Sequence, residues 1–237
     1  MSVDFAKFPT TPHLLWLGTT RARADKVLTR DEAETFLRQP VIVEEKVDGA
    51  NLGLSFDAHG NLLAQNRGNL LQRGIKDQFA PLWTWLSERE TRLFDALEDR
   101  FILFGEWSYA RHSIHYTRLP DYFLAFDVFD KLDRKFLSSV QRDQICGELK
   151  LATVPKVGTG VFSLVEIARL IGQSSLYDGP MEGIYLRQES SLWLIQRAKV
   201  VRAEFVQLIG EHWLNQPMVA NRLGSSGALR FEGTIEL

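Results

Sequence analysis

The sequence predicts an α+β fold in which antiparallel sheets are flanked by helices. Short strand patterns follow one another across polar turns such as residues 57–61, which indicates hairpins rather than strand–helix–strand units. Helical patterns stand between groups of strands instead of after every strand. With 237 residues, 45% of them hydrophobic and 24% charged, the chain has enough apolar material for a core. We expect a single domain over residues 1–237.

Charge and cysteine content narrow the class of protein. The formal net charge is −2 and the isoelectric point is about 6.2, so no basic field covers the whole protein, although a local cluster of Lys and Arg could still bind phosphates. Cys146 is the single cysteine, which excludes an internal disulfide and favours a reducing compartment. No apolar run approaches the roughly 20 residues of a membrane span, and the first residues contain no signal peptide. We expect a cytoplasmic monomer without a membrane partner.

The first 40 residues predict an extended arm and a short helix. Two prolines followed by an apolar run indicate that the arm, residues 1–30, packs against a sheet. Asp31 is the expected N-cap of the helix, because acidic residues follow it in the first turn. Pro40 closes this helix.

The stretch from Val41 to Phe56 organises the rest of the chain. It predicts a hairpin made of an apolar β-branched strand, a tight polar turn and a second strand. Lys46 lies at the mouth of the turn, two residues before Asp48, and Gly49 allows a close approach of the backbone to a ligand. A lysine in this place can act as a nucleophile or as a phosphate clamp, although a surface hairpin with solvated side chains gives the same pattern.

Three later strands carry candidate site residues. Residues 62–65 form a strand that ends beside Arg67, and residues 101–107 form an apolar strand that ends with Glu106. An acid in an apolar strand is either exposed at the strand end or committed to a ligand. Phe126 lies in the next strand. By themselves, Arg67 would be an ordinary loop arginine and Phe126 a core residue.

A second hairpin, residues 181–205, carries the remaining candidates. Glu182 opens its first strand beside a glycine, where a ligand can approach the backbone. Arg197 and Lys199 share one face of its second strand, and Arg202 follows. Helices are also expected over 78–99, with Asp77 as cap, and over 139–149. A third helix should run from the capping box at 163–166 to residue 171, and a fourth through Trp213 within the C-terminal segment 203–237. A short strand is expected over 153–157.

Two stretches resemble a known family. Residues 46–51, KVDGAN, resemble the KxDGxN box of the covalent nucleotidyltransferases, the superfamily of ATP-dependent RNA ligases, DNA ligases and mRNA capping enzymes. Residues 108–130, SYARHSIHYTRLPDYFLAFDVFD, resemble a bacterial and phage branch of the RNA ligase family. The resemblance implies that Lys46 attacks the α-phosphate of ATP and retains AMP. It also implies that Glu106 binds the ribose, that Phe126 stacks on the adenine and that Arg67 contacts a phosphate.

The last box departs from the superfamily pattern. The superfamily has Lys-x-Lys there, whereas this chain has Lys199 followed by two valines. Either Arg197 and Lys199 form the basic pair, or Lys199 works with Arg202. The resemblance implies the following assignments: catalytic Lys46, Asp48, Glu182 and Lys199; ATP-binding Glu45, Lys46, Asn51, Arg67, Glu106, Phe126, Glu182, Arg197, Lys199 and Arg202; and Glu182 and Asp48 for Mg²⁺ or Mn²⁺.

A lysine attacks phosphorus only when its amine is neutral, but its ordinary pKa is about 10.4. A nearby cation disfavours the ammonium form and neutralises adjacent acids, so we expect a divalent metal. The resemblance implies an ATP-dependent RNA ligase that joins RNA 3'-hydroxyl and 5'-phosphate ends through a lysyl-AMP and an RNA-adenylate. The alternatives are a compact DNA ligase and a catalytically silent module that binds RNA ends. Asn51 favours the RNA branch, because the other branches usually have Arg there. Only 35 residues follow Arg202, too few for an OB-fold domain, so we expect none.

Overall fold

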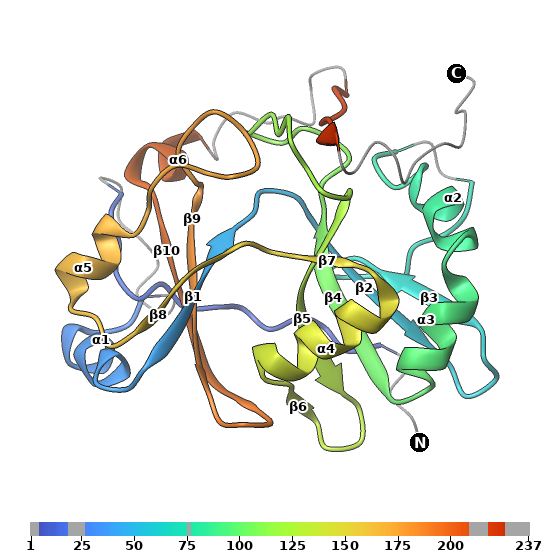
Figure 1. Cartoon of the computed structure of the whole chain (residues 1–237), viewed down its shortest axis with the longest axis horizontal. Helices are drawn as coiled ribbons and strands as arrows, with labels where there is room; N and C mark the ends of the chain where they lie inside the picture. The colour runs from blue at the N-terminus through green and yellow to red at the C-terminus, as the bar shows by residue number, and fades with distance from the viewer. Residues whose placement is uncertain (1–4, 19–26, 75–76, 209–217, 226–237) are drawn as a thin grey trace.

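The computed structural model describes residues 5–18, 27–74, 77–208 and 218–225. Within these ranges the chain forms ten strands and six helices, which make two sheets with helices on their outer sides (Figure 1), as the α+β prediction requires. The longest of the described helices has 11 residues, and none has the length and apolar content of a membrane span. The elements in chain order are α1 (Arg30–Leu37), β1 (Val41–Lys46), β2 (Ala50–Phe56), β3 (Leu62–Gln65), α2 (Leu82–Ser87), α3 (Glu90–Leu97), β4 (Phe101–Trp107), β5 (Phe123–Asp130), β6 (Lys135–Phe136), α4 (Ser139–Leu149), β7 (Ala152–Thr153), β8 (Lys156–Gly160), α5 (Leu164–Arg169), β9 (Gly183–Glu189), β10 (Leu194–Val201) and α6 (Ala203–Leu208).

The first sheet contains four antiparallel strands in the order β10-β9-β1-β8. Helices α1 and α5 cover one face of it, and their apolar residues, such as Phe36 and Ile167, pack on Val43 and Leu186 of the sheet. The N-terminal arm adds to the edge strand β10, since Leu14 N–H donates to the carbonyl of Lys199 at 2.8 Å. The prediction that the arm packs against a sheet is therefore confirmed for its described part.

The second sheet has the order β3-β2-β4-β5-β6, and the short strand β7 pairs with β5 in parallel. Along β2 the side chains of Leu52, Leu54 and Phe56 enter one core with Trp85 and Leu93 of α2 and α3, as the alternating pattern predicts. The hairpin of β2 and β3 is also confirmed.

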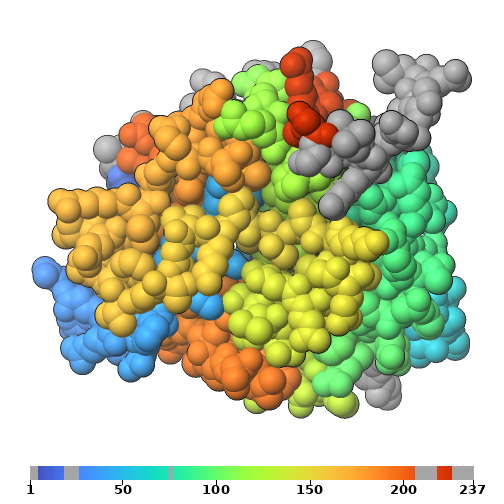
Figure 2. All heavy atoms as spheres, in the orientation of Figure 1, coloured from blue at the N-terminus to red at the C-terminus, as the bar shows by residue number. Residues whose placement is uncertain are grey.

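The predicted hairpin over residues 41–56 is wrong. Strand β1 pairs with β8 and β9 in the first sheet, whereas β2 pairs with β3 and β4 in the second sheet. The turn Val47–Gly49 therefore carries the chain from one sheet to the other. The local pattern fits both arrangements, because alternation gives the face of a strand but not its partner. In Figure 2 the segment from α4 to α5 covers the junction of the two halves on this side of the molecule.

Two helix boundaries differ from the predictions. The N-cap of α1 is Thr29, whose side chain accepts from Glu32 N–H in a capping box, and Asp31 lies inside the helix. The predicted helix over 78–99 is two helices, α2 and α3, separated at Glu88 and Arg89. Asp77 does cap a turn there, but that turn precedes α2.

The remaining elements follow their predictions closely. Helix α4 covers the predicted residues 139–149. Helix α5 begins at Leu164, with Ser163 as N-cap and Glu166 completing the predicted capping box, but it ends at Arg169. The single strand expected over 153–157 is divided into β7 and β8. Helix α6 begins the predicted C-terminal helix; its expected continuation through Trp213 lies outside the described residues.

Candidate functional site

A cavity of about 380 Å³ lies between the two sheets. Its lining residues come from β1 and the start of β2, from β9 and β10, and from β4 and β5. The N-terminal arm closes part of it. A cavity of this size is typical of small-molecule sites. Its lining residues are Phe8, Pro9, Thr11, Glu44, Glu45, Lys46, Val47, Gly49, Asn51, Arg67, Glu106, Phe126, Val154, Tyr185 and Lys199.

Lys46, the last residue of β1, lies beside a buried acid. Its Nζ is 2.5 Å from Oε1 of Glu182, which is only 4% exposed. The register explains this pair, because Lys46 lies opposite Gly183 at the start of β9, directly after Glu182. Gly183 must be a glycine, since a Cβ there would lie 2.1 Å from the carbonyl oxygen of Val200. The close approach of β10 thus fixes the acid beside the amine.

A second acid enters the site from the other sheet. Glu106 in β4 lies opposite Asn51 in β2, and both line the cavity. Gly49 lets the turn between the sheets lie against the end of β4, because a Cβ there would be 2.8 Å from Ser108 Oγ and 3.3 Å from Glu106 Cβ. The turn that carries Lys46 is thereby held against the strand that carries Glu106.

Burial and crowding shift the protonation of these groups. Burial, opposed by the nearby ammonium of Lys46, raises the pKa of Glu106 to about 8 and that of Glu182 to about 7. Burial alone would lower the pKa of Lys46, but Glu182, Glu106 and Asp48 outweigh it and raise that pKa above its ordinary value. Lys46 is therefore a protonated amine in the protein without ligand.

Several buried oxygen atoms in the cavity or beside it lack a hydrogen-bond partner within the described residues. Within the described part of the chain, Oε2 of Glu45, Glu106 and Glu182 and Oδ1 of Asn51 accept no hydrogen bond from protein. The other carboxylate oxygen of Glu45 accepts from Ser174 Oγ at 2.6 Å. Buried acceptors are costly unless a donor or a cation reaches them. These atoms mark the places where a ligand would complete the site.

Asp48 is held by a loop that follows β4. Its Oδ2 accepts from the backbone N–H of Ser113 at 2.7 Å and of Ile114 at 3.0 Å. Its own N–H donates to the hydroxyl of Tyr116 at 2.8 Å. His112 of the same loop contacts Gln78 at 2.8 Å. Three hydrogen bonds to Asp48 therefore hold the turn after Lys46 against this loop.

The N-terminal arm connects both sheets across the cavity. On the first sheet, Lys199 N–H donates to the carbonyl of Pro12 at 3.0 Å, and the hydroxyls of Thr11 and Tyr185 are 3.0 Å apart. On the second sheet, Arg67 donates to Thr10 Oγ1 at 3.3 Å. The arm therefore holds the backbone of Lys199 and contacts the side chain of Arg67, the two candidate phosphate-binding residues on opposite sheets.

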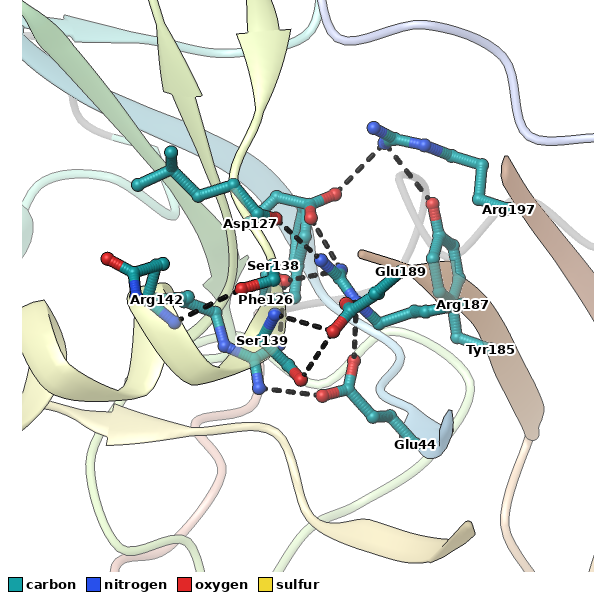
Figure 3. Close-up of polar contacts among 12 residues, drawn as sticks. Glu44, Phe126, Asp127, Ser138, Ser139, Arg142, Tyr185, Arg187, Glu189 and Arg197 are labelled. Atoms are coloured by element: carbon teal, nitrogen blue, oxygen red, sulfur yellow. Dashed lines mark hydrogen bonds and ion pairs between the residues drawn. The ribbon is translucent and has the colours of Figure 1, made fainter. Parts of the chain in front are cut away.

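A buried ionic network lies behind the cavity and joins the two sheets (Figure 3). Arg187 of β9 pairs with Asp127 of β5 at 2.5 Å and also with Glu189. Arg142 of α4 pairs with Glu44 of β1 at 2.7 Å. Both arginines donate to the carbonyl of Phe126, at 3.0 Å and 2.8 Å. The network therefore fixes the backbone of Phe126 and the carboxylate of Glu44, both of which line the cavity.

The structure brings most of the predicted site residues together. Glu45, Lys46, Asn51, Arg67, Glu106, Phe126 and Lys199 line the cavity, and Glu182 contacts Lys46. Three others do not line it. Asp48 faces the loop after β4, Arg197 bonds Asp127 at 2.9 Å, and Arg202 donates to the carbonyl of Met181 at 2.5 Å.

Sequence reasoning missed some residues of the cavity. Glu44 and Tyr185 lie opposite each other in β1 and β9. If the pairing of these strands had been known, Tyr185 could have been predicted from the position of Glu44. The period of two along β9 also puts Tyr185 on the same side as Gly183. Phe8 and Thr11 of the arm gave no signal, because nothing local says which surface an extended arm will cover.

Two antiparallel sheets with a lysine and buried acids in the cavity between them define a protein of the covalent nucleotidyltransferase fold. More narrowly, the chain belongs to the RNA ligase family, whose model matches residues 39–201.

Solved structures of Naegleria gruberi RNA ligase are similar in fold. The structure with pyrophosphate has a TM-score of 0.59 at 16% identity, and the match covers 87% of this chain and 62% of that one. A variant solved with AMP and Mn has a TM-score of 0.56 at 14% identity, with 85% of this chain and 63% of that one covered. This chain thus spans about 60% of the length of these proteins. No curated protein sequence matches the chain significantly.

Proposed function

We propose that the protein is an ATP-dependent RNA ligase that joins a 3'-hydroxyl to a 5'-phosphate through a lysyl-AMP and an RNA-adenylate. The observation that carries the proposal is the position of Lys46 at the end of β1, against Glu182 and inside a cavity with unpartnered buried acceptors. Lys46 Nζ would attack the α-phosphorus of ATP, forming an N–P bond while the bond to the β-phosphate oxygen breaks and pyrophosphate leaves. AMP would then pass to the RNA 5'-phosphate, and the 3'-hydroxyl would displace it.

The cavity walls suggest how the nucleotide lies. Phe126 offers an aromatic side chain for the adenine, and Glu106 has a buried carboxylate oxygen that can accept from the ribose hydroxyls. Arg67 and Lys199 supply positive charge for the phosphates from opposite sheets. Such fixed charges stabilise the negative charge that accumulates as pyrophosphate leaves. Glu45 and Asn51 complete the proposed ATP contacts.

The basic partner of Lys199 remains a choice between two arginines. Arg197 lies two residues before Lys199 on the same strand face, where it is stacked 4.0 Å from the ring of Phe136 and bonded to Asp127. Arg202 follows the end of β10. We propose Arg197, because its guanidinium is also 3.3 Å from the hydroxyl of Tyr185, which lines the cavity.

The acids fit a divalent cation that is held in part by the nucleotide phosphates. Among the described residues no group of three or more His, Cys, Asp or Glu could hold a metal, but magnesium commonly takes one or two carboxylates together with phosphate oxygens and water. Glu182, with its unpartnered Oε2, and Asp48 are the proposed ligands for Mg²⁺ or Mn²⁺. A cation bound there would offset the negative charge that keeps Lys46 protonated.

Other findings support the proposal. Naegleria gruberi RNA ligase variants were solved with ATP and Mn and with AMP and Mn. Cys146 is buried, and burial raises the pKa of its thiol to about 12, which disfavours the reactive thiolate. We propose a cytoplasmic location for the protein. We further propose that residues 1–237 act as one domain and as a monomer.

Intact mass of the protein after incubation with ATP and a divalent cation tests the proposal. We expect a covalent AMP that is stable to base and labile to acid, as a phosphoramidate is. Lys46→Arg should form none, because Arg keeps the charge but does not deprotonate in proteins. Lys46→Arg should still seal a pre-adenylylated RNA end to some extent. An adduct on this variant would place the nucleophile elsewhere.

Substrate preference separates the alternatives. Ends with RNA on the 3'-hydroxyl side should be sealed faster than all-DNA nicks, since the 2'-hydroxyl distinguishes the two. Equal rates would favour a DNA ligase. A wild-type protein that binds RNA ends but acquires no AMP would be a silent binding module.

A further inference from the structure

The described C-terminal segment, residues 218–225, lies against the loop of residues 108–116 that follows β4. In Figure 1 the short red segment at the top lies beside the green loop between β4 and β5. Backbone bonds connect them, since Arg111 N–H donates to the carbonyl of Val219 at 2.7 Å and Asn221 N–H to that of Tyr109 at 2.8 Å. The loop belongs to residues 108–130, one of the two stretches that resemble the RNA ligase family, but the proposed chemistry gives it no role.

Asn221 is the centre of this contact and is only 2% exposed. Its Oδ1 accepts from Tyr116 N–H at 2.8 Å. Its Nδ2 donates to the carbonyls of Ser108 at 2.8 Å and Ala110 at 3.2 Å. One side chain therefore closes the loop by joining both of its ends. Three buried backbone groups would lose their partner if the amide were removed.

The same loop holds Asp48. Ser113 and Ile114 N–H both donate to Asp48 Oδ2, and the hydroxyl of Tyr116 accepts from Asp48 N–H. Tyr116 is fully buried and is thus bonded on one side to Asn221 and on the other to the turn after Lys46. A continuous set of hydrogen bonds connects Asn221 to that turn.

We propose that Asn221 is a positioning residue that clamps the 108–116 loop and thereby holds Asp48 and the Lys46 turn in place for attack on the nucleotide. The inference rests on the proposed function. Phe126 and Tyr185, which line the cavity, lie on β5 and β9, and Asn221 is not among the residues that line it. Loss of the clamp should therefore slow the transfer of AMP much more than it weakens ATP binding.

Hydrogen exchange tests the clamp independently of any activity. Asn221→Ala should lower the protection of the amides of Ser113, Ile114 and Asp48. Val219→Ala is the matched control, because Val219 lies in the same segment with a 45% exposed side chain and contacts the loop through its backbone. Unchanged protection in Asn221→Ala would overturn the proposal.

Single-turnover formation of the AMP adduct tests the positioning role. Misplacement of reacting groups by about 1 Å can cost about 100-fold, so we expect Asn221→Ala to slow the adduct about 10- to 100-fold while the ATP dissociation constant changes less than about 3-fold. Tyr116→Phe keeps the ring but removes the hydroxyl that accepts from Asp48, and should act in the same direction with the fold preserved. Val219→Ala should match the wild type.

The outcomes separate this inference from the proposed function. A wild type that forms no adduct would overturn the proposed function, whatever the exchange data show. If the wild type forms the AMP adduct and both Asn221→Ala and Tyr116→Phe form it at the same rate, only the positioning role would be overturned. A loss of ATP affinity equal to the loss of rate would also overturn it, because the clamp would then serve the fold of the whole cavity.

Discussion

Glu106→Gln tests whether the acids of the site hold their protons when no ligand is bound. Burial raises the pKa of Glu106 to about 8, whereas in the unfolded chain it ionises near 4.5. Between these values the folded protein binds a proton that the unfolded chain has released, so the free energy of unfolding falls as pH rises. Each pH unit in this window is worth about 1.4 kcal/mol, so the interval from 4.5 to about 8 gives an upper limit of about 5 kcal/mol lost by pH 8.

Gln cannot ionise, so Glu106→Gln should remove this contribution to the pH dependence. We expect urea unfolding of the wild type, in EDTA and without nucleotide, to show a stability that is highest near pH 5 and decreases towards pH 8. At pH 8 the variant should be more stable than the wild type by about 2 to 4 kcal/mol and should show a flatter profile. It should also form the AMP adduct more slowly, because the proposed ribose contact loses a charged acceptor.

Glu148→Gln is the control, since Glu148 is an exposed acid on α4. Its profile should follow that of the wild type. The reasoning fails if wild-type stability is constant or rises between pH 5 and pH 8, or if Glu106→Gln follows the wild type across the range. Glu182, whose pKa is about 7, should leave a smaller slope of the same sign in the Glu106→Gln protein.

Two further substitutions test the aromatic wall and the ionic network. Phe126→Ala should weaken ATP binding, measured by titration, by about 1 to 3 kcal/mol through loss of stacking. Phe129→Ala, in the same aromatic cluster but outside the cavity, should leave the affinity for ATP unchanged. Equal effects of the two substitutions would make Phe126 a core residue only. Arg187→Met should lower the free energy of unfolding by about 3 to 5 kcal/mol, because it leaves buried Asp127 with one partner fewer. Adding Asp127→Asn should restore part of this loss. A cost of Arg187→Met below about 1 kcal/mol would contradict a buried, mutually dependent network.

Local patterns in the sequence were sufficient for much of the fold. The β2–β3 hairpin, helix α4 and the capping box of α5 were predicted because each depends on residues close in the chain. The helix over 78–99 was predicted as continuous because its apolar spacing continues through Glu88 and Arg89. In the structure the helix is interrupted there, and the guanidinium of Arg89 folds back over the Trp85 ring at 4.5 Å and donates to the carbonyl of Trp85.

By itself the sequence predicted which residues would carry the proposed chemistry: Lys46 at a strand end, Glu106 at the end of an apolar strand and Glu182 before a strand glycine. Motif spacing and strand periodicity are local properties, so they can be recognised without the fold. Only the tertiary structure decided that β1 and β2 belong to different sheets and that the site lies between these sheets instead of on a hairpin. It also decided that Asn221 holds the loop beside Asp48. The choice of strand partners depends on contacts between residues far apart in the chain, and no local pattern specifies them.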